Sequence, residues 1–245
     1  MTAGTPATAA TAATLSGLLA NRERLAIAAR AIEPLLNRVV FTGRQVAELL
    51  ATNPVVAMPR STFASDVVLR VLSTASLDRV AVDLQRLGLR RGARTATSDR
   101  WSVGASVTLD LTYVSGDEND PSTIWLEYAS LLTMAVNVGN GLSARITGAP
   151  ALLALDWAAF RSSGESALDS GELEDVIVLV AGRAEVVREM GAAPPELRSF
   201  VASETRRFLE YDGAGHVIQF AIPDARQFPM LADRAAERLR SIAAL

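Results

Sequence analysis

Residues 38–51 read Arg-Val-Val-Phe-Thr-Gly-Arg-Gln-Val-Ala-Glu-Leu-Leu-Ala, and residues 64–72 read Ala-Ser-Asp-Val-Val-Leu-Arg-Val-Leu. The apolar run before Gly43 predicts a short strand, and the residues after this glycine predict a helix. The second stretch predicts a buried strand over 67–72, with Asp66 at its mouth. A strand, a glycine turn, a helix and a strand with an acid at its start are typical of a nucleotide-binding site.

The composition is that of a globular protein. The chain has 245 residues, of which 49% are hydrophobic and 21% charged, and its net charge is −3. Such a chain can bury a full core, and its charge gives no general sign of nucleic-acid binding. The absence of Cys excludes disulfides, thiolate catalysis and Cys-based metal sites. All 24 basic residues are Arg, so no lysine can form a Schiff base or bind phosphate.

The chain divides into three predicted parts. Residues 1–14 are rich in Ala and Thr and predict a disordered leader rather than a signal peptide. Residues 15–148 alternate predicted strands and helices, and residues 149–245 predict helices only. The expected fold class is therefore α/β (α+β), a small mixed β-sheet half followed by a helical C-terminal half. No apolar run reaches the length of a membrane span, and we expect a cytoplasmic location without a membrane partner.

Several local features predict individual elements. Ser76 is expected to N-cap a helix that ends at Gly88. The basic stretch 89–94 predicts a turn, either solvated or in contact with RNA, with the first more typical. Residues 126–136 fit either a helix or a strand. His216, the only histidine, is expected in a glycine-rich loop, where it faces solvent or caps a helix rather than acting as a catalytic base.

Two acids in predicted strands are candidate site residues. Asp110 lies within the strand predicted over 106–114, on the opposite face from the apolar positions of that strand. An unpaired acid in such a strand is costly, so Asp110 is either a site residue or the partner of an arginine. Asp66 is either a metal ligand or a turn and capping acid.

The order and spacing of short segments carry a resemblance to a known family. The most specific segment is residues 172–183, Glu-Leu-Glu-Asp-Val-Ile-Val-Leu-Val-Ala-Gly-Arg. The others are Phe-Thr-Gly at 41–43, Pro-Arg-Ser-Thr at 59–62, Arg-Trp at 100–101, Leu-Asp-Leu at 109–111, Gly-Ala-Pro at 148–150, Ala-Phe at 159–160 and Ala-Pro-Pro-Glu-Leu-Arg at 193–198. From about Val39 to Leu245 the chain resembles nucleotidyltransferase-fold proteins of the AbiEii toxin type, in the DNA-polymerase-β-like superfamily.

The resemblance implies a particular metal site. In that family an Asp-x-Asp pair and a third acid on a neighbouring strand hold two Mg²⁺ ions, which activate the attacking hydroxyl and neutralise the leaving group. The matching segment here is Ala64-Ser65-Asp66, so the first acid is lost and the second is kept. Asp110 matches the third acid. Asp66 and Asp110 are thus the catalytic and metal-binding candidates. With the first acid lost, these two residues are expected to bind Mg²⁺ only weakly.

The resemblance also implies a nucleotide site. Gly43 matches the glycine turn that holds phosphates, but the small residue after it is replaced by Arg44. Asp156 stands where the family carries a basic residue, which reverses the charge. Because these two departures have opposite signs, we expect Arg44 and Asp156 to pair and to fill the phosphate pocket. Glu172 and Asp175 match an acidic pair of the family. This pair either faces the former active site or interacts with the positive N-terminal end of its own helix.

Two functions follow from these departures. The favoured interpretation is a pseudoenzyme with a degenerate active site, which keeps the fold to bind a partner or ligand. The alternative is an active enzyme that uses Mg²⁺ to move a nucleotide from an NTP onto RNA or a protein hydroxyl. The resemblance further implies a bacterial toxin–antitoxin system, with an antitoxin as a partner.

Overall fold

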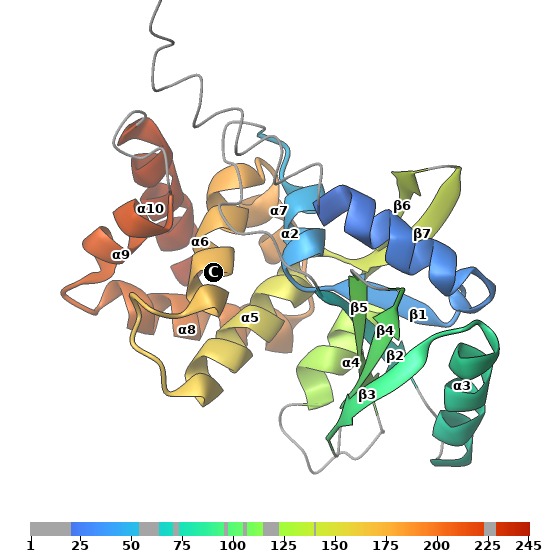
Figure 1. Ribbon diagram of the computed structural model, residues 1–245. Coiled ribbons are helices and arrows are strands. Elements are labelled where there is room, and N and C mark those ends of the chain that lie inside the picture. The colour runs from blue at the N-terminus through green and yellow to red at the C-terminus, as the bar shows by residue number, and fades with distance from the viewer. Residues whose placement is uncertain are drawn as a thin grey trace, which may run out of the picture.

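The computed structural model describes residues 21–53, 64–70, 74–95, 98–104, 107–114, 123–139, 141–222 and 229–245. The predicted fold class is confirmed, because a mixed β-sheet half is followed by a helical half (Figure 1). The predicted leader at 1–14 lies outside the described residues. The division after residue 148 stays a prediction.

The first half contains all seven strands that the described residues form. They are β1 (Val39–Thr42), β2 (Ala64–Arg70), β3 (Arg90–Arg94), β4 (Ser98–Val103), β5 (Val107–Val114), β6 (Thr133–Gly139) and β7 (Leu142–Thr147). The helical segments of this half are residues 21–31, η1 (Glu33–Leu35), α2 (Arg44–Leu50), α3 (Thr74–Arg86) and α4 (Thr123–Leu131).

The second half is helical throughout its described residues. Its elements are α5 (Ala149–Ser163), α6 (Gly171–Gly182), α7 (Val186–Gly191), α8 (Pro195–Leu209), α9 (Ala214–Ala221) and α10 (Pro229–Ala243). Ser170 caps α6, because its hydroxyl oxygen accepts from the Leu173 amide. No described helix is long and apolar enough to cross a membrane.

The sheet has the strand order β3-β4-β5-β2-β1-β7-β6. β2 pairs in parallel with β5, and β1 pairs in parallel with β7, while the other neighbours are antiparallel. Helices cover one face, where Ile32, Val80 and Leu84 line a small cavity with Leu109 and Leu111 of β5. The alternation predicted for β5 is confirmed, because its odd-numbered residues are buried and its even-numbered residues through Thr112 are partly exposed.

The prediction of a turn at residues 89–94 is wrong, because residues 90–94 form the edge strand β3. The carboxylate of Asp99 on β4 holds this strand in place by an ion pair with Arg91 and a longer one, of 3.5 Å, with Arg94. The Arg91 guanidinium also lies 5.5 Å from the centre of the Trp101 ring. Cross-strand contacts, rather than local propensity, therefore make β3 a strand.

Three other boundaries differ from the predictions. α3 begins at Thr74, so Ser76 lies inside the helix and not at its cap. The segment 126–136, which fitted either a helix or a strand, contains one of each: α4 ends at Leu131 and β6 begins at Thr133. His216 lies in α9 rather than in a loop, although it is exposed as predicted. α9 forms because Val217 and Ile218 are buried in the helical half.

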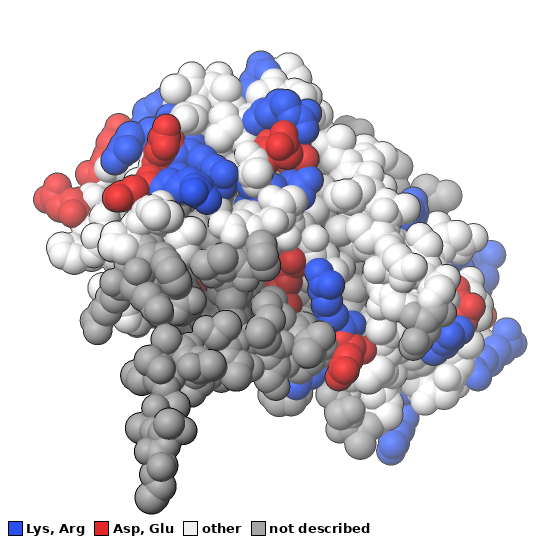
Figure 2. Space-filling model, turned by 90° about the horizontal axis from the view of Figure 1, so that it is seen from above, with Lys and Arg blue, Asp and Glu red and all other residues white. Residues whose placement is uncertain are grey.

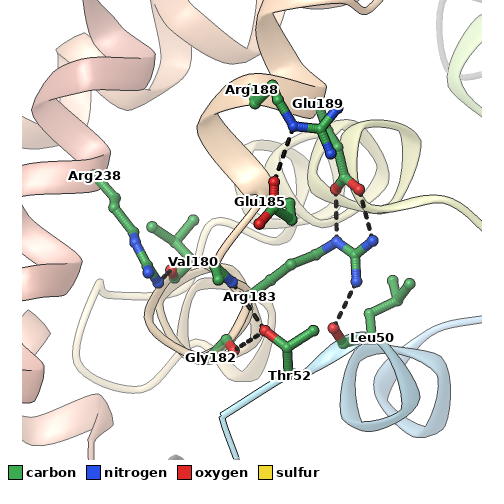
Figure 3. A network of polar contacts seen from close by, with 10 residues as sticks. Leu50, Thr52, Val180, Gly182, Arg183, Glu185, Arg188, Glu189 and Arg238 are labelled. Atoms are coloured by element: carbon green, nitrogen blue, oxygen red, sulfur yellow. Dashed lines mark hydrogen bonds and ion pairs between the residues drawn. The ribbon is translucent and has the colours of Figure 1, made fainter.

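A polar network joins the two halves at the C-terminal ends of α2 and α6 (Figure 3). Arg183 donates to the Leu50 carbonyl over 2.7 Å and binds both carboxylate oxygens of Glu189 at 2.6 Å. The Thr52 hydroxyl donates to the Gly182 carbonyl over 3.2 Å. The last carbonyls of α2 and α6 have no N–H partner within their own helix, and these side chains supply the missing donors. The same hydrogen bonds connect α2 to α6.

Candidate active site

Four polar residues form a row across one face of the sheet. Thr42 on β1 pairs in register with Asp66 on β2. Asp66 is also opposite Asp110 on β5, which in turn is opposite Arg100 on β4. Residues that are directly opposite on neighbouring strands point to the same face of a sheet. We call Thr42, Asp66, Asp110 and Arg100 the polar row.

Gly43 presses against the acid at the centre of this row. Its backbone has a φ of +73° and a ψ of −164°, a combination that L-residues with side chains avoid. A Cβ atom on Gly43 would overlap Oδ2 of Asp66 and lie 3.0 Å from its Cγ. Only glycine therefore lets the turn between β1 and α2 come this close to the carboxylate.

Asp66 lies inside a strand rather than at its mouth, because β2 begins two residues earlier, at Ala64. The pKa of Asp66 is raised to about 7, first by burial and then by the neighbouring Asp110 carboxylate. Arg100 and Arg44 act in the opposite direction on this pKa. A substantial fraction of the Asp66 side chains is thus protonated near neutral pH.

Asp110 is held by an arginine on the next strand. Nε of Arg100 donates to Oδ1 of Asp110 over 2.7 Å, and Nη2 donates to Oδ2 over 2.6 Å. This is the two-pronged geometry in which a guanidinium binds a carboxylate most strongly. The sequence allowed Asp110 to be either a site residue or the partner of an arginine. In the structure Asp110 lies opposite Asp66 and is also paired with Arg100.

The residues present do not fit the Mg²⁺ site that the resemblance implies. Among the described residues no three acid or histidine side chains are arranged to hold a metal ion. Both oxygens of Asp110 already bind Arg100. Position 64 is Ala and supplies no ligand. Mg²⁺ prefers several ionised oxygen ligands, which this arrangement does not offer.

Arg44, the first residue of α2, reaches across to the helical half. Its Nη2 lies 3.0 Å from Oδ1 of Asp175 and donates to the Gly171 carbonyl over 3.2 Å. The side chains of Arg44 and Asp175 are only 14% and 11% exposed. The predicted ion pair between Arg44 and Asp156 is therefore wrong in its partner, because α6 rather than α5 provides the carboxylate.

Asp156 on α5 nevertheless lies close to the same guanidinium. Its Oδ2 is buried without a hydrogen-bond partner among the described residues. The pKa of Asp156 is raised well above its usual range, first by burial and then by the charges of Asp175, Glu172 and Asp66, while Arg44 lowers it. Burial and the acids around it therefore both favour the protonated form of Asp156.

Glu172 and Asp175 divide the two predicted roles between them. Glu172 accepts from the hydroxyl of Ser170 over 3.0 Å, at the N-terminal end of α6. Asp175, one turn later, points to Arg44. The structure thus gathers all the predicted nucleotide-site residues together with the predicted metal ligand Asp66. We call this set the Arg44 cluster: Gly43, Arg44, Asp66, Asp156, Glu172 and Asp175.

Glu48 is a site neighbour that the sequence did not single out. It lies one turn after Arg44 on α2, is buried, and accepts from Nδ2 of Asn21 over 2.5 Å. Burial raises the pKa of Glu48 to about 7, although Asn21 and Arg44 lower it. The signal that could have found it is a carboxylate between the apolar residues Ala47 and Leu49.

We expect Glu48 to make stability fall as the pH rises. The pKa of Glu48 is about 7 in the folded state against 4.5 for the free side chain, so the folded state binds the proton more tightly. The stability that this proton contributes is lost as the pH rises from 4.5 through 7. Replacing Glu48 by Gln should remove this dependence. Between pH 5 and pH 8 the wild type should lose about 2 kcal/mol of unfolding free energy relative to Glu48→Gln. Urea unfolding of both proteins at the two pH values measures it, and equal losses would contradict it.

Two of the three arginines of β3 share one acid as their partner. Arg91 and Arg94 are engaged by Asp99, as described above. On the face that Figure 2 shows, arginines and acids are mixed over the helical half rather than gathered into one basic surface. All five residues of β3 are exposed, as the solvated interpretation expects, and RNA contact stays a prediction.

Comparison with known proteins gives similarity of shape only. No protein-family model and no curated protein sequence matches the chain. An antigenic nucleotidyltransferase-like protein from Paracoccidioides brasiliensis is 16% identical, with a TM-score of 0.49, over 78% of this chain and 90% of its own. JHP933 from Helicobacter pylori is 10% identical, with a TM-score of 0.49, over 93% and 92%. The antibiotic-resistance factor ANT(2'')-Ia is 11% identical, with a TM-score of 0.43, over 86% and 99%. At these values function has to be argued from the residues of the site.

Proposed function

We propose that the chain is a nucleotidyltransferase-fold protein of the AbiEii toxin type that has lost metal-dependent nucleotidyl transfer and acts as a binding protein. The observation that carries this proposal is the pair formed by Arg100 and Asp110, in which both carboxylate oxygens are bound to the guanidinium. A cation that belongs to the chain neutralises the acid that would otherwise bind a metal. With Ala at position 64, the site lacks the acids that two-metal transfer requires.

The Arg44 cluster supports the same proposal from the side of the substrate. A nucleotide brings several negative charges, and binding sites favour them with backbone N–H groups and cations. Here the guanidinium of Arg44 is engaged by Asp175, and Asp66 and Asp156 lie near it. The Asp175 carboxylate thus neutralises the only cation of the cluster, which leaves no free positive charge there for a phosphate. The pocket is thus filled by interactions of the chain with itself.

We expect neither Mg²⁺ nor any NTP to stabilise the protein, alone or together. A ligand present at 100 times its Kd would stabilise the folded state by about 2.7 kcal/mol. Thermal unfolding of the full chain with Mg²⁺, with each of the four NTPs and with both together measures this. A stabilisation that needs both Mg²⁺ and an NTP, and that Asp66→Asn abolishes, would support the active transferase and refute the proposal.

A restored variant separates lost chemistry from a wrong fold assignment. Ala64→Asp adds an acid two residues before Asp66, on the same face of β2. Combined with Arg100→Ser, which frees Asp110, it should give Mg²⁺-dependent stabilisation. Ala64→Asp with Arg90→Ser, a change on the exposed strand β3, is the matched control and should stay insensitive to Mg²⁺. No response of the restored variant would argue against the nucleotidyltransferase assignment itself.

The partner follows from the resemblance and not from the site. The AbiEii type points to an antitoxin protein, so co-purification of the chain with the product of an adjacent coding sequence is the first test of the binding role. A stable complex that survives Asp66→Asn and Asp110→Asn would show that binding does not use the polar row. A complex that forms only with both acids intact would place the partner at that row.

A further inference from the structure

A cavity of about 450 Å³ lies in the sheet half, between residues 33–37 and the strand β7. Figure 1 shows the start of β1, which follows residues 33–37, on the side of the sheet half that faces away from the helical half. No residue of the polar row or of the Arg44 cluster lines this cavity. Its volume is that of a small-molecule site. The cavity is therefore separate from the candidate active site.

Arg145 of β7 is the cation of this cavity. Its Nη2 donates to the Asn37 carbonyl over 2.7 Å and to the Val39 carbonyl over 3.4 Å, so the fold holds the guanidinium in place. Among the residues that the structure describes, no acid forms an ion pair with Arg145, and its buried Nε has no hydrogen-bond partner. Arg44 and Arg100, by contrast, each bind a carboxylate of the chain. Because a buried donor without an acceptor costs stability, Arg145 is ready to gain from an added anion.

The other polar groups of the cavity wall do not compete for this cation. Ser143, two residues before Arg145 on the same face of β7, is exposed, and so is Asn37. A hydroxyl and a side-chain amide can both donate to a bound oxygen. Glu33 is the one acid among the described residues of the wall, and its Oε2 lies 2.7 Å from Nη1 of Arg30. The negative charge of the wall is thus balanced without Arg145.

We propose that this cavity binds a small organic monocarboxylate, with its carboxylate at Arg145 and its apolar body against Pro34, Leu36 and Ala144. A guanidinium binds a carboxylate through two parallel hydrogen bonds, which is the strongest neutral-pH pairing of these groups. A single cation balances the single charge of a monocarboxylate but not the charge of a phosphate, which is about −2 at neutral pH. The three apolar residues favour an alkyl chain for the same reason that they favour burial.

A chemical-shift titration of the ¹⁵N-labelled full chain with hexanoate, hexanamide and inorganic phosphate tests the proposal. Hexanoate should shift the amide signals of residues 143–145 and 36–37 and should saturate in the millimolar range. Hexanamide has the same alkyl chain without the charge and should bind about tenfold more weakly, and phosphate should also bind more weakly than hexanoate. Equal binding of hexanamide, tighter binding of phosphate, or shifts confined to other segments would overturn the proposal.

Two variants show whether Arg145 is the group that binds the carboxylate. Arg145→Gln should weaken hexanoate binding about tenfold. The matched control Arg206→Gln removes an exposed arginine that also donates to a backbone carbonyl, that of Ala243, and should leave binding unchanged. Ser143→Lys adds a second cation to the wall and should tighten binding severalfold, a gain that a misfolded variant cannot give. Hexanoate binding that neither Arg145→Gln weakens nor Ser143→Lys tightens contradicts this assignment.

Discussion

Replacing Asp99 by Ala should lower the free energy of unfolding by about 3–5 kcal/mol. The Asp99 side chain is 0% exposed and binds the Arg91 guanidinium. Its Oδ2 also accepts from the Tyr113 hydroxyl over 2.7 Å, and burial together with this bond raises the Tyr113 pKa. Without the carboxylate, the partly buried guanidinium of Arg91 loses its counter-charge and the Tyr113 hydroxyl loses its hydrogen-bond acceptor. Both changes destabilise the edge of the sheet at β3 and β4.

Urea unfolding measures this loss, with two comparisons. Asp233→Ala removes an exposed acid from α10 and should change stability by no more than about 0.5 kcal/mol. Tyr113→Phe should cost about 1 kcal/mol in the wild type and almost nothing beside Asp99→Ala, because the acceptor is already gone. If Tyr113→Phe costs the same in both backgrounds, the buried Asp99 is not the partner of that phenol in solution.

Replacing Gly43 by Ala should cost about 3 kcal/mol. The residue has a φ of +73° with an extended ψ, a region that alanine enters only under strain. The added methyl would also overlap the Asp66 carboxylate. The change therefore combines backbone strain with displacement of the acid at the centre of the polar row.

Two further variants separate these contributions. Gly164 has a φ of +69°, but a Cβ there would meet no atom within 4 Å, so Gly164→Ala measures strain alone and should cost about 1 kcal/mol. Combining Gly43→Ala with Asp66→Ala removes the overlap, and the pair should be less destabilising than the sum of the single changes by about 1 kcal/mol. Strict additivity would show that the turn and the carboxylate are not in contact.

The sequence predicted those parts of the site that depend on neighbours along the chain. The apolar run before Gly43 and the amphipathic run after it are local, so β1 and α2 form where they were expected. The alternation around Asp110 placed this acid on the polar face of β5 for the same reason. The gathering of Asp66, Asp156 and Asp175 was implied only by the family resemblance, since no spacing relates a strand to helices so far along the chain.

What the sequence did not predict depends on contacts between distant segments. β3 is a strand because Asp99 of β4 binds its arginines, and α9 is a helix because the helical half buries two of its residues. Neither contact has a signal within the segment itself. Glu48 was missed because its raised pKa comes from burial in the folded protein, which a reading of α2 alone does not reveal.

By itself the sequence determined the α/β class, the glycine turn, and the presence of an acid at position 66 and of alanine at position 64. These properties depend on residue identity and on the periods of strands and helices. Only the tertiary structure decided the partners of the two arginines at the site. The register of β4 against β5 gives Arg100 to Asp110, and the packing of α6 against α2 gives Arg44 to Asp175 rather than to Asp156. Charges choose partners by distance in space, and folding alone sets that distance.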